Sequence, residues 1–292
     1  MTDRYESLKK TARRRPAAAW RLPVWLLLLV LVVAGGLAFF FNSDRFALRA
    51  IEIRGQRLLT AEMIATVARQ TLAGRRWFFF RRDRYWFYSP TQLSAALRAR
   101  FTRLAAVTPQ VSGWNTLQLQ ITERRTVALW CAKDSVPTEN CFYLDETGLA
   151  FARAPHFSAS PLITIVGADP PAVSSTPLLN SQPLPRARFH HLLNLKLALE
   201  EFFRSAPPLD NFAVQKITAT ADGDYKFYFT GPNQTPAGFE IIITRTQTVA
   251  EILDRLESVL AVPEFQAELT PAARLEYLDL RFGHKIFYRF RN

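Results

Sequence analysis

Few side chains in this chain of 292 residues could bind a metal or attack a substrate. Cysteine occurs twice, at Cys131 and Cys141, and two thiols are too few for a four-cysteine zinc site. Histidine occurs four times, and the adjacent residues His190 and His191 cannot both turn toward one ligand from a helix. The sequence therefore predicts no metal site.

An acid and a base two residues apart, Asp279 and Arg281, are the next candidates for catalysis. At that spacing their side chains share one face of a strand, where a structural ion pair explains them better than a catalytic acid and its activator. The sequence also lacks the G-x-S-x-G and H-E-x-x-H motifs and the glycine-rich phosphate loops of common enzymes. We expect no catalytic residue, no cofactor and no small-molecule substrate.

The two cysteines flank a short polar segment, AKDSVPTEN. A disulfide between Cys131 and Cys141 would close a loop of 11 residues. In the chain-entropy model such a bridge stabilises the fold by roughly 3 kcal/mol, and it needs an oxidising compartment. The alternative interpretation is a pair of reduced thiols at the edge of a strand.

The composition predicts folded domains with anionic partners. Hydrophobic residues make up 49% of the chain and charged residues 21%, which is enough apolar surface for real cores, and the length suits two domains. Thirty-seven Lys and Arg residues against 25 Asp and Glu residues give a net charge of +12. This excess favours nucleic acid, phospholipid headgroups or acidic wall polymers as partners.

One segment near the N-terminus is long and apolar enough to cross a membrane. No charged residue occurs from Leu22 to Ser43, and roughly 20 apolar residues in a helix span a hydrocarbon core of about 30 Å. A secretory signal has a shorter apolar region and a small-residue cleavage site. We therefore predict an uncleaved transmembrane helix over residues 22–43.

The charges before this segment predict its orientation. Residues 1–21 carry seven basic and two acidic side chains, a net charge of +5. The positive-inside rule keeps such a short tail in the cytoplasm and places the remainder of the chain outside. We interpret the tail as a topology signal, and we expect no nucleic-acid partner.

Residues 77–88 read WFFFRRDRYWFY, with eight aromatic residues out of twelve. One interpretation is an aromatic belt at the membrane surface with arginines among the headgroups. Its residues would be Trp77, Phe78, Arg81, Arg82 and Trp86. The other interpretation, which we favour, is a connection between two helices that packs its rings into a core.

The roughly 80 residues that follow the apolar span predict the element order strand, helix, helix, strand, strand. The expected ranges are 46–55, 60–74, a helix from Ser89-Pro90, 104–111 and 116–123. For the first helix we predict Thr60 as the N-cap and an apolar stripe of Met63, Ile64, Val67 and Leu72.

From residue 125 onward the pattern is rich in strands. Turn sequences at DETG and at Asp222-Gly223 predict two hairpins, over residues 143–151 and 217–229, and FEIIIT predicts a buried strand. Helical spacing of apolar residues predicts helices over 188–204 and 246–262. The fold class is therefore α+β, with a strand-rich second domain and flanking helices.

Four strings in the sequence resemble the FtsQ/DivIB family of bacterial cell-division proteins. They are IEIRGQRLLT, ITERRTVALW, FYLDETGLAF and LEYLDLRFGHKIFYRF, and they follow a basic tail and one apolar span in this order. The resemblance implies a POTRA domain (β-α-α-β-β) over residues 45–124 and an FtsQ/DivIB-type β domain over residues 125–292. It also implies that the bulk of the chain lies outside the bacterial inner membrane.

Proteins of this family are thought to act as non-enzymatic scaffolds. The resemblance implies that the chain holds small membrane partners of the FtsB and FtsL type and through them governs septal peptidoglycan synthesis. Membrane lipid is the other expected partner. Two alternatives remain: a membrane-anchored enzyme that modifies the cell wall, and a POTRA-type module that handles exported polypeptides.

The resemblance also implies that the region after LDLRF docks a partner. The predicted docking strand consists of Lys285, Ile286, Phe287, Tyr288, Arg289 and Phe290. Side chains at even positions would face one side and those at odd positions the other, and an exposed strand can add a partner strand. The alternative is a closing strand that only seals the core.

Overall fold

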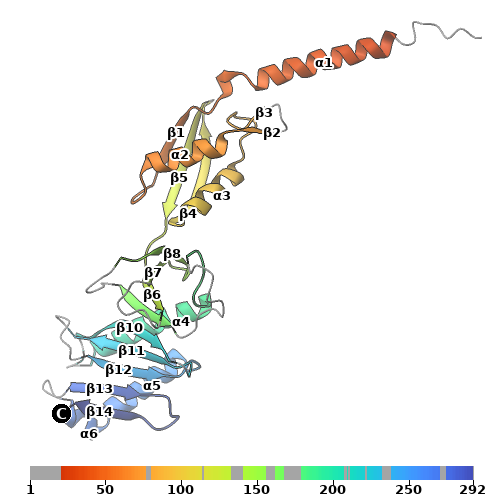
Figure 1. Ribbon diagram of the computed structural model, residues 1–292. Coiled ribbons are helices and arrows are strands. Elements are labelled where there is room, and N and C mark those ends of the chain that lie inside the picture. Colours follow the sequence, from red (N-terminus) through yellow and green to blue (C-terminus); the bar gives the residue numbers. More distant parts are fainter. Residues whose placement is uncertain are drawn as a thin grey trace, which may run out of the picture. The chain divides into compact units, whose positions relative to one another are not determined.

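The computed structural model shows an α+β protein with an N-terminal apolar helix and a strand-rich sheet domain (Figure 1). It describes residues 21–76, 80–113, 115–132, 141–155, 162–167, 179–206, 209, 211–220, 222–231, 238–269 and 274–291. The chain divides into two compact units. The first contains residues up to 97 together with 106–122, and the second contains residues 98–105 and 123 onward.

The first helix, α1 (Arg21–Phe41), is long and apolar enough to cross a membrane. At 1.5 Å per residue its 21 residues reach about 31 Å, the thickness of a bilayer core. None of the span from Val24 to Phe41 is buried against the protein.

The first unit has a three-stranded sheet in the order β1-β5-β4. Strand β1 runs parallel to β5, and Ile51 lies opposite Leu117. Leu117, Leu119 and Ile121 of β5 are buried, which confirms the predicted alternation. The elements that lie wholly or mostly in this unit after α1 are η2 (Asp44–Phe46), β1 (Ala50–Arg54), α2 (Ala61–Leu72), β2 (Arg75–Arg76), β3 (Phe80–Arg81), α3 (Pro90–Arg100), β4 (Leu104–Ser112) and β5 (Thr116–Glu123).

Helix α2 begins as predicted, with the side chain of Thr60 accepting a hydrogen bond from the backbone N–H of Met63. The predicted apolar stripe is partly wrong. The buried residues are Ile64, Ala65, Ala68 and Leu72, whereas the side chain of Met63 is half exposed. Two alanines occupy core-facing positions, and their short side chains let the helix lie close to its neighbours.

The second unit has a nine-stranded sheet in the order β14-β13-β12-β11-β10-β9-β6-β7-β8. Both predicted hairpins are present, as β7 with β8 and β10 with β11. The strands are β6 (Ala128–Ala132), β7 (Cys141–Leu144), β8 (Ala150–Arg153), β9 (Ile163–Gly167), β10 (Ala213–Ala219), β11 (Tyr225–Thr230), β12 (Phe239–Ile243), β13 (Arg274–Asp279) and β14 (Phe287–Arg291).

Three helices, α4 (Arg186–Arg204), α5 (Val249–Leu260) and α6 (Pro263–Glu268), share one hydrophobic core with this sheet. Helix α5 begins with a capping box in which Thr248 and Glu251 exchange hydrogen bonds. At the centre of the core the rings of Phe229 and Phe239 stack with centroids 4.7 Å apart, and Phe203 of α4 meets both edge-on. Burial of these rings holds α4 against the middle of the sheet.

The two cysteines lie opposite each other on β6 and β7, with their Cα atoms 4.2 Å apart and their sulfurs bonded. Both side chains are buried. The bridge ties together the two strands on either side of the segment AKDSVPTEN. Residues 133–140 of that segment lie outside the described residues.

The β7–β8 turn is organised by the carboxylate of Asp145. Its Oδ1 accepts hydrogen bonds from the backbone N–H groups of Thr147 and Leu149 at 2.8 and 3.0 Å, and its Oδ2 accepts one from Arg124. Burial alone would raise the pKa of Asp145, but the hydrogen bonds from Thr147, Leu149 and Arg124 outweigh it and lower that pKa below its ordinary value. The turn therefore depends on the charged form of Asp145.

Replacement of this carboxylate by an amide tests that dependence. We expect Asp145→Asn to lower the free energy of unfolding by about 1 kcal/mol at pH 7, because the amide keeps the turn hydrogen bonds but loses the charge facing Arg124. The folded-state pKa is depressed, so the stabilisation is complete above the ordinary pKa of 3.8 and disappears as the pH falls through the folded value. Urea unfolding of the part after α1, followed by tryptophan fluorescence, should show the two proteins converging below pH 3.8. An equal difference in the free energy of unfolding at every pH would show that the charge of Asp145 does not stabilise the turn.

Candidate functional site

Strand β14 forms one edge of the nine-stranded sheet and pairs with β13. Tyr288 lies opposite Leu278, and Phe287 lies opposite Asp279. On its outer side, a strand at the border of a sheet carries N–H and C=O groups with no strand beside them. Within the described ranges, no strand lies beside the outer edge of β14.

One side of β14 belongs to the core of the second unit. Ile286, Tyr288 and Phe290 pack against that core, and the rings of Tyr288 and Phe290 lie 4.9 and 5.4 Å from the ring of Phe265 on α6. These contacts hold the strand on the sheet while leaving its outer edge open.

The other side of β14 faces away from the core. Phe287, Arg289 and Arg291 are exposed. The predicted docking segment, 285–290, is shifted by one or two residues from the observed strand, because Lys285 and Ile286 belong to the turn that precedes it. Docking at this strand stays a prediction.

A groove of about 1250 Å³ lies on the face of the sheet that turns away from the helices. Its lining consists of residues of β10 to β14 together with residues of the β13–β14 turn, among them Tyr228, Ile242, Tyr277 and Phe282. These four are aromatic or aliphatic side chains on the open face of a sheet. A partner that covers the β14 edge would also meet them.

The charged groups of the groove are mostly paired with one another. Lys226 lies 3.3 Å from Glu240, and Arg289 donates two hydrogen bonds to Glu276. The hydrogen bond and charge of Arg289 lower the pKa of Glu276, and Glu276 in turn raises the pKa of Arg289. The basic residues that remain, Lys216, Lys285 and Arg291, leave the groove with an excess of positive charge.

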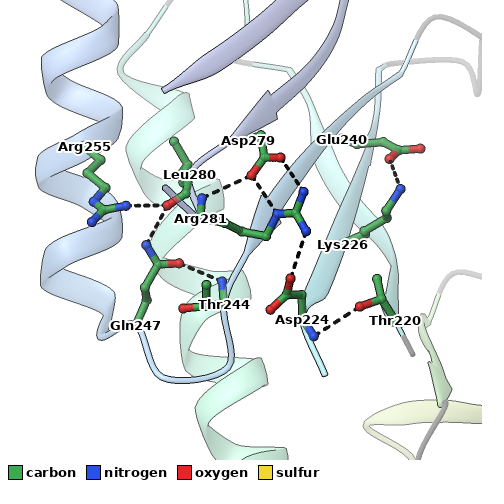
Figure 2. Close-up of polar contacts among 10 residues, drawn as sticks. All are labelled: Thr220, Asp224, Lys226, Glu240, Thr244, Gln247, Arg255, Asp279, Leu280 and Arg281. Atoms are coloured by element: carbon green, nitrogen blue, oxygen red, sulfur yellow. Dashed lines mark hydrogen bonds and ion pairs between the residues drawn. The ribbon is translucent and has the colours of Figure 1, made fainter. Parts of the chain in front are cut away.

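The turn after β13 is fixed by Arg281, whose guanidinium lies between two carboxylates (Figure 2). Arg281 donates to Asp279 at 2.9 and 2.7 Å and to Asp224 at 3.0 Å. The hydrogen bonds that Arg281 donates to Asp279 and Asp224 raise the pKa of Arg281 above its ordinary value. The predicted ion pair of Asp279 and Arg281 is confirmed, and the structure adds Asp224, which follows the Asp222-Gly223 turn.

A second set of hydrogen bonds holds the same turn from the helix side (Figure 2). The carbonyl of Leu280 accepts hydrogen bonds from Gln247 at 2.8 Å and from Arg255 of α5. The side-chain oxygen of Gln247 accepts one from the backbone N–H of Thr244, also at 2.8 Å. The chain just after β13 is thus held by Arg255 of α5 and by Gln247 of the segment between β12 and α5.

The remaining predicted site residues lie apart from this edge. His190 lies on α4 and accepts a hydrogen bond from Arg186 at 3.4 Å. Within the described ranges, no group of three His, Cys, Asp or Glu residues is placed to hold a metal ion. The bonded cysteines lie on β6 and β7, separated from β14 by several strands.

Of the residues predicted for a membrane belt, Trp77 and Phe78 lie outside the described residues. Arg81 and Arg82 are exposed in and after the short strand β3, and Trp86 is half exposed. The ring of Trp86 lies 5.9 Å from the ring of Phe41, the last residue of α1. The segment therefore contacts the end of the apolar helix and is not buried only between α2 and α3.

Comparison with known proteins identifies no relative: no family model matches this chain, and no curated protein matches it.

The contribution of the Arg281 ion pairs to stability can be compared with that of the exposed Arg289–Glu276 pair on the same sheet. Arg281→Gln should lower the free energy of unfolding by about 2 kcal/mol, because it leaves the buried carboxylate of Asp279 without its charged donor. Arg289→Gln removes an equally bidentate but exposed pair and should change stability little. Urea unfolding of both variants at pH 7 measures the two changes in the free energy of unfolding. Equal decreases would show that burial does not determine how much each ion pair stabilises the fold.

Proposed function

We propose that the chain is a non-enzymatic scaffold of the FtsQ/DivIB type. In this proposal it is anchored in a cell membrane by α1 and binds division partners through the β14 edge. The observation that carries it is an unpaired edge strand beside an open groove on the same sheet. Partner binding at such an edge links small membrane proteins of the FtsB and FtsL type to septal peptidoglycan synthesis.

The placement of the four resembling strings supports the family assignment. IEIRGQRLLT covers β1 and the approach to α2, and ITERRTVALW runs from the end of β5 into β6. FYLDETGLAF is the β7–β8 hairpin, and LEYLDLRFGHKIFYRF is the β13–β14 pair. Each string occupies a strand pair or a strand junction, where specific side chains are needed to set register and turns.

The first unit supports a POTRA assignment for residues 45–124. Its main elements follow the order β1, α2, α3, β4, β5, and its sheet places β5 between β1 and β4. The short β2–β3 hairpin between the helices is an addition to the expected order. This hairpin belongs to the aromatic and basic segment that sets the chain apart from the family pattern.

The chemistry of the groove favours a scaffold over a wall-modifying enzyme. An active site needs titratable groups that converge on a substrate with altered pKa values. The acidic side chains lining this groove, Glu240, Glu276 and Asp279, each pair with a basic neighbour. The positive charge of the groove comes from the remaining basic residues Lys216, Lys285 and Arg291, and this charge suits an acidic segment of a partner.

A proline scan through β14 tests docking by strand addition. In an edge strand, successive N–H groups point alternately toward β13 and toward open space, so proline should damage folding at one parity and partner capture at the other. We expect two or three of the positions Phe287 to Arg291 to lose capture of an FtsB/FtsL-type partner while the melting temperature stays nearly unchanged. Capture is measured by crosslinking in membranes, and melting by circular dichroism.

The opposite edge of the same sheet provides the control. Proline at positions of β8, Ala150–Arg153, should leave partner capture intact wherever the protein still folds. If capture by β14 variants falls only in proportion to the melting temperature, β14 merely closes the core, and the docking assignment is wrong.

We also infer that the N-terminus is cytoplasmic and that residues after α1 are extracytoplasmic, because the tail carries a net charge of +5. An oxidised Cys131–Cys141 pair fits that compartment. In cells, a maleimide-PEG shift of the pair should appear only after reduction, and a cytoplasmic reporter fused after Asn292 should be inactive. Labelling of both thiols without reductant, together with an active cytoplasmic reporter, would reverse the topology.

A further inference from the structure

Two segments far apart in the sequence lie side by side where α1 ends. We call residues 42–49 and 80–88 the juxtamembrane collar. The backbone N–H of Leu48 donates to the carbonyl of Asp83 at 2.8 Å, and that of Tyr85 donates to the carbonyl of Phe46 at 3.0 Å. These two bonds flank an antiparallel bridge between Ala47 and Arg84. The collar is therefore a built element with a fixed register.

An ion pair with one buried partner holds the two segments together. Arg84 is 1% exposed, and its Nη2 lies 2.8 Å from Oδ1 of Asp44, whose side chain is largely exposed. The hydrogen bond and charge of Arg84 lower the pKa of Asp44 below its ordinary value. The backbone N–H of Arg81 also donates to the side chain of Asn42, at 3.4 Å. Residues 81 and 84 are thus tied directly to the first residues after α1.

Aromatic side chains place the collar at the boundary of the apolar helix. The ring of Phe41 lies 5.9 Å from that of Trp86 and 6.1 Å from that of Phe87. Trp86 also meets Phe46 at 6.4 Å, and 48% of its surface is exposed. If α1 crosses a bilayer, these contacts hold Trp86 at the depth where tryptophan is most stable, between hydrocarbon and headgroups.

The collar carries an excess of positive charge that the protein itself does not neutralise. It contains five arginines and two aspartates. Arg84 pairs with Asp44 and Arg81 with Asp83, so both acidic groups are used. Arg45, Arg49 and Arg82 are exposed. Within the described ranges, the side chains of these three form no hydrogen bond or ion pair.

We propose that the juxtamembrane collar binds the phosphate groups of anionic phospholipids in the leaflet where α1 ends. Arg45, Arg49 and Arg82 are the headgroup ligands, and Trp86 sets the depth. Guanidinium groups recognise phosphate oxygens by paired hydrogen bonds, and an anionic leaflet attracts basic side chains within a Debye length of its surface. The proposal depends on α1 crossing a bilayer and is independent of any division partner.

Membrane lipid is favoured over a soluble anion because of where the arginines are. They lie within eight residues of the end of α1 or on the segment that contacts Phe41 and Asn42. At that distance from a spanning helix the phosphate layer of the bilayer is the nearest and most concentrated source of negative charge. A fixed, aromatic-flanked cluster is suited to that layer.

The test uses the full chain reconstituted in phosphatidylcholine bilayers with a trace of spin-labelled phosphatidylglycerol. Electron paramagnetic resonance gives the association of the labelled lipid relative to labelled phosphatidylcholine. We expect a preference on the order of fivefold for the anionic lipid at low salt, with loss of most of it in 0.5 M NaCl, where the Debye length is about 4 Å. The variant R45Q/R49Q/R82Q should reduce the preference to about that of phosphatidylcholine.

The matched control is R54Q/R98Q/R100Q, which removes the same charge from positions further along β1 and α3. It should keep the preference of the natural chain. An unchanged preference in R45Q/R49Q/R82Q, or an equal loss in the control variant, would overturn the proposal. So would competition by inorganic phosphate beyond that of chloride at equal ionic strength, since it would indicate a site for free phosphate.

Two further measurements distinguish loss of lipid binding from loss of folding and from loss of partner binding. Circular dichroism melting of R45Q/R49Q/R82Q should match that of the natural chain, because the three side chains are exposed. Partner capture through β14 should be unaffected, so loss of lipid preference with intact capture assigns the effect to the collar.

Discussion

The arrangement of the second unit depends on the burial of one face of a sheet against three helices. Phe229 and Phe239 stack at 4.7 Å beneath Phe203, and the inward residues of the neighbouring strands extend that core from α4 to α6. Because the helices gather on one side, the outward residues of β10 to β14 must face solvent. The groove and the β14 edge are consequences of that asymmetry.

Polar contacts then hold the end of β13 and the turn that leads to β14. The guanidinium of Arg281 joins Asp279 at the end of β13 to Asp224 between β10 and β11, and the carbonyl of Leu280 receives donors from Gln247 and Arg255. Buried polar groups stabilise a fold when each has a partner, and here the partners come from four different elements. They fix the turn, while the aromatic residues of β14 hold the strand itself.

The β14 edge and the juxtamembrane collar use similar residue types in different ways. At β14, Arg289 pairs with Glu276 of the neighbouring strand, and aromatic rings line both the core and the groove. At the collar, Arg84 is buried in an ion pair, whereas Arg45, Arg49 and Arg82 stay exposed beside Trp86. The first pattern suits an ordered protein partner, and the second suits a fluid layer of phosphate groups.

Local sequence signals determined much of this protein. An uncharged run predicted a helix long enough to span a membrane, Thr60 predicted a cap, DETG and Asp222-Gly223 predicted hairpins, and alternation predicted the buried side of β5. These features depend on neighbours in the chain. Three other features could not be predicted in this way: the core alanines of α2, the pairing of Arg281 with Asp224, and the pairing of residues 42–49 with 80–88. They depend on which distant segments meet, and only the tertiary structure decides which side chains come within hydrogen-bonding or packing distance.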